Sequence, residues 1–116
     1  MSKHDPVITL RELRNFAQEA AEIACGKNRG DLEKERSFCR HAERVVELIG
    51  EAANRLPKEI QQRHLSVPWK QIVGMRNWLV HGYDGVDYDI LWDVISVRAP
   101  QLVKDLSSII ESEAKD

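Results

Sequence analysis

The feature that most constrains the fold is a stripe of apolar residues that recurs every three or four positions in the middle of the chain. The stripe consists of Phe38, Ala42, Val45, Ile49, Ala52 and Leu56. Because charged residues fill positions between them, the pattern predicts one long amphipathic helix from about Asp31 or Leu32 to Leu56. Gly50 lies inside this helix at a cost of about 1 kcal/mol relative to alanine, which we explain by the close approach of a neighbouring helix.

The segment before the stripe predicts a first helix from about Leu10 to Ala24. Thr9 is its expected N-cap residue, and Glu12 occupies the third helical position, where a carboxylate completes a capping box. Gly26 follows the expected end, where a left-handed glycine commonly terminates a helix.

Prolines and glycines mark the helix boundaries after the stripe. Pro57 predicts a short helical turn that extends to about Arg63. Pro68 is the expected first residue of a third main helix, which runs through Leu79 and ends at Gly82.

The last helix has a recognisable start and a recognisable interruption. Asp87 is expected to cap it, after a turn at Asp84-Gly85. Pro100 lacks the N–H group that an unbroken helix needs, so we expect a kink or a short break near Ala99.

Together these segments predict an all-α fold, an antiparallel bundle of four to five helices. The chain has 116 residues, of which 42% are hydrophobic and 31% are charged, and this composition is typical of one soluble domain. The domain is expected to span residues 1–116, with a frayed N-terminus at about 1–6 and a charged tail at about 111–116. No apolar run approaches the ~20 residues of a membrane span, so we expect a cytoplasmic protein without membrane contacts.

The formal charges limit the kind of partner that the chain can bind. A net charge of −2 argues against strong binding of nucleic acid over a whole face. The 17 Lys and Arg residues still allow a local basic cleft, so any contact with RNA is expected at a confined site.

Few side chains outside one segment have the pattern of a reactive site. Cys25 and Cys39 lack metal-ligand spacing and lie in apolar-periodic stretches, which predicts two free thiols that are buried or half-buried. His4, His41 and His64 are scattered among polar neighbours, and we interpret them as solvated or structural. The sequence therefore predicts neither a metal site nor a cofactor.

His81 is the exception, because it immediately precedes Gly82 at the expected C-terminal end of a helix. The carbonyl groups and the dipole at such an end favour a protonated imidazole, which suits proton transfer near neutral pH. Asn77 lies one turn earlier on the same face, whereas Arg76 lies about 140° away and reaches the imidazole only through its long side chain. Tyr83 follows the helix end, where the loop can return its hydroxyl group.

These residues suit the cleavage of RNA by its own 2′-hydroxyl group. The histidine would move the proton, while the arginine would stabilise charge on the phosphoryl oxygens. The reaction also favours a second group that returns a proton, and one chain offers only one well-placed histidine. We therefore expect a homodimer whose symmetry axis brings two copies of the helix end together. Taken as spacing alone, Arg-x4-His is also common by chance, and a histidine at a helix end is often only a cap.

Short motifs over about residues 36–106 resemble the HepT-like family of HEPN domains in order and in spacing. They are Ala42-Glu43-Arg44, Ile49-Gly50-Glu51-Ala52-Ala53, Val67-Pro68-Trp69, Gly74-Met75-Arg76-Asn77, Val80-His81-Gly82-Tyr83 and Leu91-Trp92. The resemblance implies a four- or five-helix HEPN bundle that dimerises, with the Arg-polar-x3-His motifs meeting at a cleft between the subunits. It also implies a metal-independent endoribonuclease, the toxin of a type VII-like toxin–antitoxin pair, with RNA as its substrate.

Carried over to this chain, the resemblance makes Arg76 and His81 the catalytic pair and Asn77 the polar residue after the arginine. Tyr83 matches the tyrosine that, in some members, accepts AMP groups from a cognate MntA-type minimal nucleotidyltransferase, which acts as the antitoxin. Glu51 is expected either to line the same cleft from the long helix or to face solvent as an ordinary surface residue.

Two other functions are compatible with the sequence. The first is a non-catalytic HEPN binding subunit that partners a minimal nucleotidyltransferase and offers Tyr83 for modification. The second is a nucleotide-binding helical scaffold. Trp69, Trp78 and Trp92 could stack on bases, but their helical spacing favours a place in the core.

Overall fold

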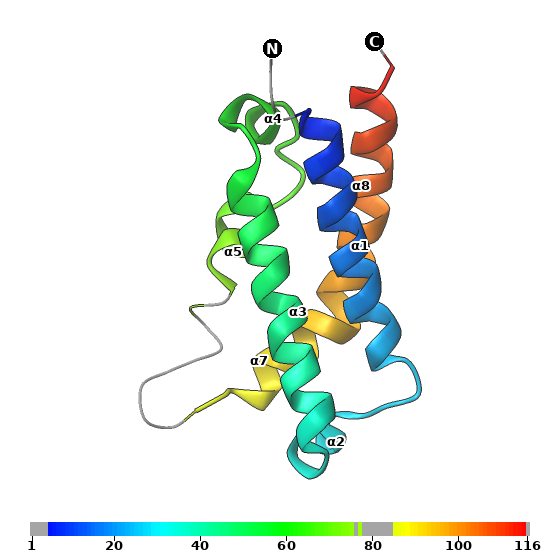
Figure 1. Ribbon diagram of the computed structural model, residues 1–116, viewed down its shortest axis with the longest axis vertical. Helices are drawn as coiled ribbons and strands as arrows, with labels where there is room; N and C mark the ends of the chain where they lie inside the picture. The colour runs from blue at the N-terminus through cyan, green and yellow to red at the C-terminus, as the bar shows by residue number, and fades with distance from the viewer. Residues whose placement is uncertain (1–4, 76, 78–84, 116) are drawn as a thin grey trace.

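The computed structural model describes residues 5–75, 77 and 85–115, and over these residues the chain is all-α, as predicted (Figure 1). The helices are α1 (Pro6–Ala24), α2 (Arg29–Lys34), α3 (Arg36–Arg55), α4 (Lys58–Arg63), α5 (Trp69–Val73), α7 (Tyr88–Asp93) and α8 (Ala99–Glu113). A π-helix, η2 (Val94–Arg98), joins α7 to α8. In the part of the chain that is described, no helix is both long and apolar enough to cross a membrane.

The long helices form an antiparallel bundle (Figure 1). α1 runs away from the end of the molecule at which α4 lies, and α3 returns beside it in the opposite direction. α5 then runs back along α3, and α7, η2 and α8 return to the end at which α1 begins. Helices that are neighbours in sequence therefore pack as neighbours in space, which is the arrangement that short connections favour.

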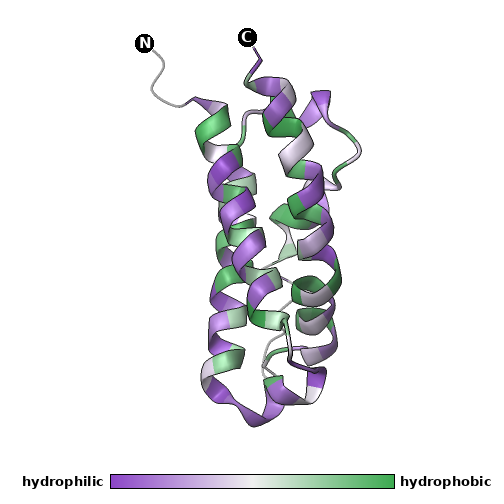
Figure 2. Cartoon of the chain, turned by 90° about the vertical axis from the view of Figure 1, so that its right-hand side faces the viewer, coloured by the Kyte–Doolittle hydropathy of each residue, from purple (hydrophilic) through white to green (hydrophobic). Residues whose placement is uncertain are grey.

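The core lies where α3 and α8 pack against α1. All residues of the apolar stripe on α3 are buried, each with at most 8% of its surface exposed. Leu13 on α1 and Leu106 on α8 are fully buried beside them. Hydrophilic and hydrophobic residues alternate along these helices, as Figure 2 shows, so each helix has one face for the core and one for solvent. Burial of each large aliphatic side chain contributes about 1.5–3 kcal/mol.

The first helix begins earlier than predicted. Pro6 is its first residue, and the Oδ1 atom of Asp5 accepts a hydrogen bond from the N–H group of Val7 at 2.9 Å. Thr9 therefore lies inside the helix, and its prediction as the N-cap was wrong, because Asp5-Pro6 provides a stronger start four residues upstream. The predicted end at Ala24 is confirmed, and Gly26 has the expected positive φ of 78°.

The predicted long helix is in fact two helices, separated at Glu35. This residue has an extended backbone (φ −115°, ψ 100°), and α2 before it has its own capping box at Asn28. On one straight helix, Leu32 and Phe38 would point about 120° apart. The break at Glu35 lets both side chains be buried, with 1% and 8% of their surfaces exposed.

The third main helix is also interrupted. Pro68 is the N-cap residue of α5 and not its first helical residue, and α5 ends at Val73 before a turn at Gly74. Met75 and Asn77 are again helical, so the prediction of one unbroken helix was wrong. The short helix predicted after Pro57 is confirmed as α4. The predicted continuation to Leu79 and the stop at Gly82 lie outside the described residues.

The break predicted near Ala99 takes the form of a wide helical turn. The N–H group of Ala99 donates to the carbonyl of Val94, an i→i−5 bond that defines η2, and Pro100 then lies in the first turn of α8. Asp87 caps α7 as predicted, and its Oδ1 atom accepts hydrogen bonds from the N–H groups of Asp89 and Ile90 at 3.0 and 3.1 Å. α8 continues to Glu113, beyond the expected start of the charged tail.

Candidate functional site

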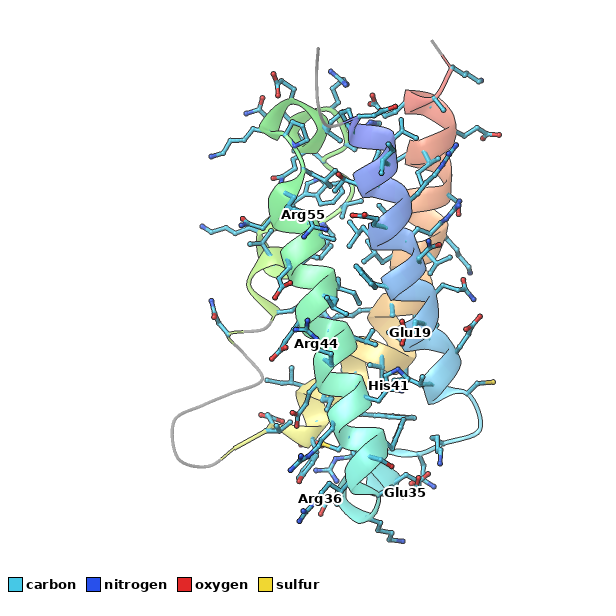
Figure 3. All side chains as sticks on the ribbon, in the orientation of Figure 1. Glu19, Glu35, Arg36, His41, Arg44 and Arg55 are labelled. Carbon is cyan, nitrogen blue, oxygen red and sulfur yellow. The ribbon has the colours of Figure 1, made fainter. Side chains whose placement is uncertain are left out.

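A polar hollow of about 550 Å³ opens between α3 and α5. It is lined by Gly50, Glu51, Asn54 and Arg55 on α3 and by Lys70, Val73, Gly74 and Asn77 on and after α5. Arg55, labelled in Figure 3, marks its position towards the α4 end of α3. The hollow therefore lies immediately before the segment in which the sequence predicts the catalytic residues.

Gly50 determines how closely the two walls of the hollow approach each other. A Cβ atom at this position would lie 3.3 Å from the carbonyl oxygen of Val73 and 3.4 Å from that of Ile72. Any larger residue would press directly on the backbone of α5. The expectation that Gly50 permits a close helix approach is confirmed.

The hollow carries charges of both signs. Arg55 forms an ion pair with Glu12 of α1, with Nη2 and Oε1 3.0 Å apart, which holds its guanidinium towards α1. Lys70 is exposed on the α5 wall and has no ion-pair partner among the residues that the structure describes. Glu51 is half-buried on the α3 wall. A ligand with phosphate and hydroxyl groups would find a cation and hydrogen-bonding side chains here.

The structure brings two of the predicted site residues together. Asn77 is exposed, its N–H group donates to the carbonyl of Gly74 at 3.0 Å, and it lines the same hollow as Glu51. Arg76, His81 and Tyr83 lie outside the described residues, so they stand as predictions from the sequence.

The sequence analysis did not single out three residues that share this hollow. They are Asn54, Arg55 and Lys70. A signal for the first two was present, because Asn54 and Arg55 lie three and four positions after Glu51 and so on the same side of one helix. Lys70 had no such signal, since its place opposite α3 depends on how α5 packs.

The other histidines have structural partners. His41 on α3 points to Glu19 on α1, with Nε2 and Oε2 2.6 Å apart (Figure 3). His64 lies 2.6 Å from the Oε2 atom of Glu113. The interpretation of both as surface or structural residues is confirmed, and His4 lies outside the described residues. Hydrogen bonds from Arg63 first, and then from His64, lower the pKa of Glu113 from 4.5 to about 2.

The two thiols differ from each other. Cys39 is buried as predicted, and burial, followed by a hydrogen bond to Glu43, raises its pKa from 9.0 to about 11. Cys25 is exposed, so its predicted burial was wrong. It is the first residue after α1, where the helical periodicity that buries its neighbours no longer applies.

The tryptophans that the structure describes lie in the core or pack against it. Trp69 is buried, and its Nε1–H group donates to the carbonyl of His64 at 2.9 Å. Trp92 packs against the core and is partly buried, so the core interpretation holds for both, while Trp78 lies outside the described residues. Over residues 5–75, 77 and 85–115, no group of three His, Cys, Asp or Glu side chains could hold a metal ion.

The antiparallel all-α bundle is the fold of a HEPN-type domain, as the sequence motifs imply. The family described as "Ribonuclease HepT-like" matches residues 11–109. The chain therefore belongs to the HepT-like ribonuclease family.

Several relatives support this membership. A protein of Caldanaerobacter subterraneus subsp. tengcongensis named "Putative RNase" is 43% identical over 83 residues, which are 72% of this chain and 74% of the relative. A "Putative RNase" of Methanocaldococcus jannaschii is 28% identical over 109 residues, 94% of this chain and all of the relative. A "Probable ribonuclease HepT" of Thermococcus cleftensis is 37% identical over 59 residues, 51% of this chain and 54% of the relative. No solved structure matches the chain.

Proposed function

We propose that this chain is the cytoplasmic ribonuclease toxin of a type VII-like toxin–antitoxin pair and that it cleaves RNA as a homodimer. The observation that carries the proposal is the motif of Arg76, His81 and Tyr83. This motif lies within the region that matches the HepT-like ribonuclease family. Asn77, which follows Arg76 in the motif, lines the polar hollow between α3 and α5. The relatives that are named as ribonucleases support the same function.

The proposed chemistry is an internal transfer at phosphorus that needs no metal ion. His81 removes the proton from a ribose 2′-hydroxyl group, and the freed oxygen attacks the adjacent phosphorus. The bond from phosphorus to the 5′-oxygen of the next nucleotide breaks, and that oxygen takes a proton from His81 of the partner subunit. Arg76 stabilises the charge that develops on the phosphoryl oxygens. The products are a 2′,3′-cyclic phosphate and a 5′-hydroxyl group.

The hollow offers side chains that can hold the substrate near this motif. Asn77 can donate its carboxamide N–H groups to a phosphate or ribose oxygen. Lys70 adds a positive charge from the α5 wall, and the Glu51 carboxylate has several acceptor positions for ribose hydroxyl groups. These three residues come from both walls, so a bound nucleotide would bridge α3 and α5.

Three exposed arginines form a row on the half of α3 that lies towards α2. Arg36, Arg40 and Arg44 follow at four-residue steps, which places them about 6 Å apart along one side of a helix. Arg44 is paired with Glu47 at 3.1 Å, whereas Arg36 and Arg40 have no acidic partner within ion-pair distance in the described part of the chain. Figure 3 shows Arg36 and Arg44 on α3, with Arg55 beyond them. This row can contact the phosphates of an RNA strand that leads to the hollow.

Control by an antitoxin follows from the position of Tyr83 in the motif. A minimal nucleotidyltransferase of the MntA type would transfer AMP from a nucleoside triphosphate to the tyrosine hydroxyl and release pyrophosphate. The new phosphodiester adds a negative charge and a purine two residues from His81. Both would exclude the RNA backbone from the site.

The test compares His81→Ala with the matched variant His41→Ala, since His41 is paired with Glu19 on another face. Each purified protein is incubated with RNA in the presence of a chelator, and the new RNA ends are analysed. We expect cyclic phosphate ends from the wild type and from His41→Ala, and none from His81→Ala. Equal cleavage by His81→Ala would reject the catalytic assignment. A wild type that cleaves no RNA yet binds a minimal nucleotidyltransferase would favour the non-catalytic subunit.

A further inference from the structure

A second hollow, of about 760 Å³, opens between α4 and α5. It is lined by Lys58, Gln61 and Gln62 of α4, by Leu65, Val67 and Pro68 of the connecting segment, and by Trp69, Lys70 and Gln71 of α5. Pockets that hold small organic molecules typically measure ~300–1,000 Å³, so the space suits a ligand of nucleotide size. The proposed function uses only one of these side chains, that of Lys70.

The second hollow adjoins the polar hollow between α3 and α5, because Lys70 lines both. Arg55 ends α3 and lines the polar hollow, and Lys58 begins α4 three residues later and lines the second hollow. A ligand that fills the polar hollow can therefore extend past Lys70 into the second hollow without leaving the protein surface.

The charged side chains of the second hollow are positive. Lys58 and Lys70 line it, and no acidic residue of the described chain does. Both lysines are exposed, and over residues 5–75, 77 and 85–115 neither has an ion-pair partner. Glu59, the acidic residue of α4, does not line the hollow. Two lysines without a carboxylate beside them attract a polyanion.

The second hollow also offers groups that suit a nucleic-acid base. Leu65 has 77% of its surface exposed, more than any other large apolar side chain that the structure describes. Gln62 and Gln71 are exposed beside it. An apolar side chain can pack on the face of a base, and a carboxamide can donate to its edge and accept from it. A free anion would need neither group, so the lining favours RNA.

The place of this hollow fits the path of an RNA strand along α3. That helix runs from α2 towards α4 (Figure 1), and its arginine row ends at Arg44. Glu51 of the polar hollow lies two turns after Arg44 and only about 20° away around the helix. The second hollow comes next along the chain, at Lys58. A strand that follows the row would reach the polar hollow and then the second hollow.

We propose that the second hollow is an RNA subsite, which binds the nucleotides that leave the polar hollow on the side away from the arginine row. Lys70 holds the phosphate between the two hollows, and Lys58 holds the next one. Leu65 packs on a base, and Gln62 contacts the edge of that base. The ligand is single-stranded RNA, because a paired and stacked base does not offer its face. The inference rests on the proposed function, since it extends the same substrate beyond the cleavage site.

The first experiment measures the binding of a fluorescent single-stranded hexanucleotide RNA to the His81→Ala protein, which keeps the RNA intact. Lys58→Glu in this background is compared with Lys104→Glu, the same change at an exposed lysine of α8. We expect Lys58→Glu to weaken binding about 10-fold, because a charge-assisted contact is lost. The slope of log affinity against log salt should fall by about 0.7. Lys104→Glu should keep the slope.

The apolar contact is tested in the same background with Leu65→Ser. Ile8→Ser is the control, because Ile8 on α1 is also a large apolar residue, is 58% exposed and does not line the second hollow. We expect Leu65→Ser to weaken binding of the hexanucleotide about 5-fold, since part of the leucine surface is covered by a base. Ile8→Ser should bind like the parent protein, and circular dichroism shows that each variant is folded.

Photocrosslinking locates the RNA directly. A hexanucleotide with 4-thiouridine at one end or at the other is irradiated with the His81→Ala protein, and the crosslinked peptide is identified. Crosslinks from one of the two ends to residues 58–71 are expected. Their absence from both, or equal binding by Lys58→Glu and Lys104→Glu, would overturn the proposal. Variants that bind RNA like their controls but escape inhibition by the nucleotidyltransferase would make the hollow a protein-docking surface, which also overturns it.

Cleavage of RNA is measured separately, so that the two proposals can fail independently. A wild type that cleaves no RNA, but whose binding of the hexanucleotide depends on Lys58 and Leu65, would refute the proposed function and leave the subsite intact. A wild type that cleaves the hexanucleotide, together with Lys58→Glu and Leu65→Ser variants that cleave it as well as their controls, would refute the subsite and leave the function intact.

Discussion

The backbone of Gly50 lies against the carbonyl group of Val73, so closely that a Cβ atom on residue 50 would stand 3.3 Å from the Val73 oxygen. This contact presses the end of α5 against the middle of α3. Both residues also line the polar hollow, so the position of the hollow depends on the absence of a side chain at residue 50.

Gly50→Ala should lower the free energy of unfolding by about 1 kcal/mol. Alanine gains about 1 kcal/mol of helix propensity over glycine, but overpacking against a backbone carbonyl costs about 1–3 kcal/mol. Urea unfolding measures the difference, and Gly50→Val should lose more than Gly50→Ala. Ser37→Ala, at an exposed position of the same helix, is the control and should change stability by less than about 0.5 kcal/mol. A Gly50→Ala protein more stable than the wild type would contradict the prediction.

Glu113 links the pH dependence of stability to the contact between α4 and α8. It accepts hydrogen bonds from Arg63 at 2.9 and 3.1 Å, and its pKa is about 2 in the folded protein against an ordinary value of 4.5. A carboxyl group with a lowered pKa stabilises the fold fully above its unfolded pKa, and this contribution is lost as the pH falls towards the folded pKa. The loss attributable to Glu113 therefore occurs between about pH 4.5 and pH 2.

Glu113→Gln should lower the stability at neutral pH by on the order of 1 kcal/mol, because Arg63 is 56% exposed and solvent screens the pair. It should also flatten the fall in stability between pH 4.5 and pH 2. Denaturant unfolding at several pH values measures both effects, with the exposed Glu111→Gln as the control. An acid dependence identical to that of the wild type would refute the role of Glu113.

The two cysteines should differ sharply in reactivity. The pKa of Cys39 is raised from 9.0 to about 11 by burial, so at neutral pH its thiolate is about 100-fold scarcer than that of an ordinary thiol. A thiol reagent such as DTNB should modify one group rapidly in the folded protein and both groups in denaturant. Cys25→Ser should abolish the rapid phase, whereas Cys39→Ser should retain it. A rapid phase that persists in Cys25→Ser would contradict this assignment.

The sequence predicted those parts of the fold that depend on local pattern. The apolar stripe from Phe38 to Leu56 is one buried face, and the cap at Asp87 needs only its own side chain and the following N–H groups. The sequence pattern did not predict the break at Glu35, because the break depends on the burial of both Leu32 and Phe38 against other helices. Periodicity within a single segment contains no information about where its neighbours pack.

Some residues of the candidate site could also be predicted from the sequence, and others could not. Asn77 and Glu51 could be named from motif and spacing, and both line the hollow. Lys70 could not be named, because its position opposite α3 is created by the contact between Gly50 and Val73. Residues that act through packing between helices are visible only in three dimensions.

Tyr83→Phe should separate the nuclease from its control. The phenylalanine retains the ring but has no hydroxyl group to accept AMP, so RNA cleavage should match the wild type while inhibition by the nucleotidyltransferase disappears. The measurement is RNA cleavage before and after incubation with that enzyme and ATP, with Tyr88→Phe as the control that remains inhibited. Loss of cleavage in Tyr83→Phe without any antitoxin would instead assign the tyrosine to the chemistry.

The arginine row on α3 should determine how RNA binding responds to salt. In a His81→Ala background, which keeps the RNA intact, the double change of Arg36 and Arg40 to Glu removes two candidate phosphate contacts. The slope of log affinity against log salt should fall by about 1.4, at about 0.7 for each contact with a single strand. The control changes Arg11 and Lys104 to Glu; both are exposed on other helices, and the net charge changes equally. If both double variants lower the slope to the same extent, bulk charge governs binding, and the row on α3 is not the path of the RNA.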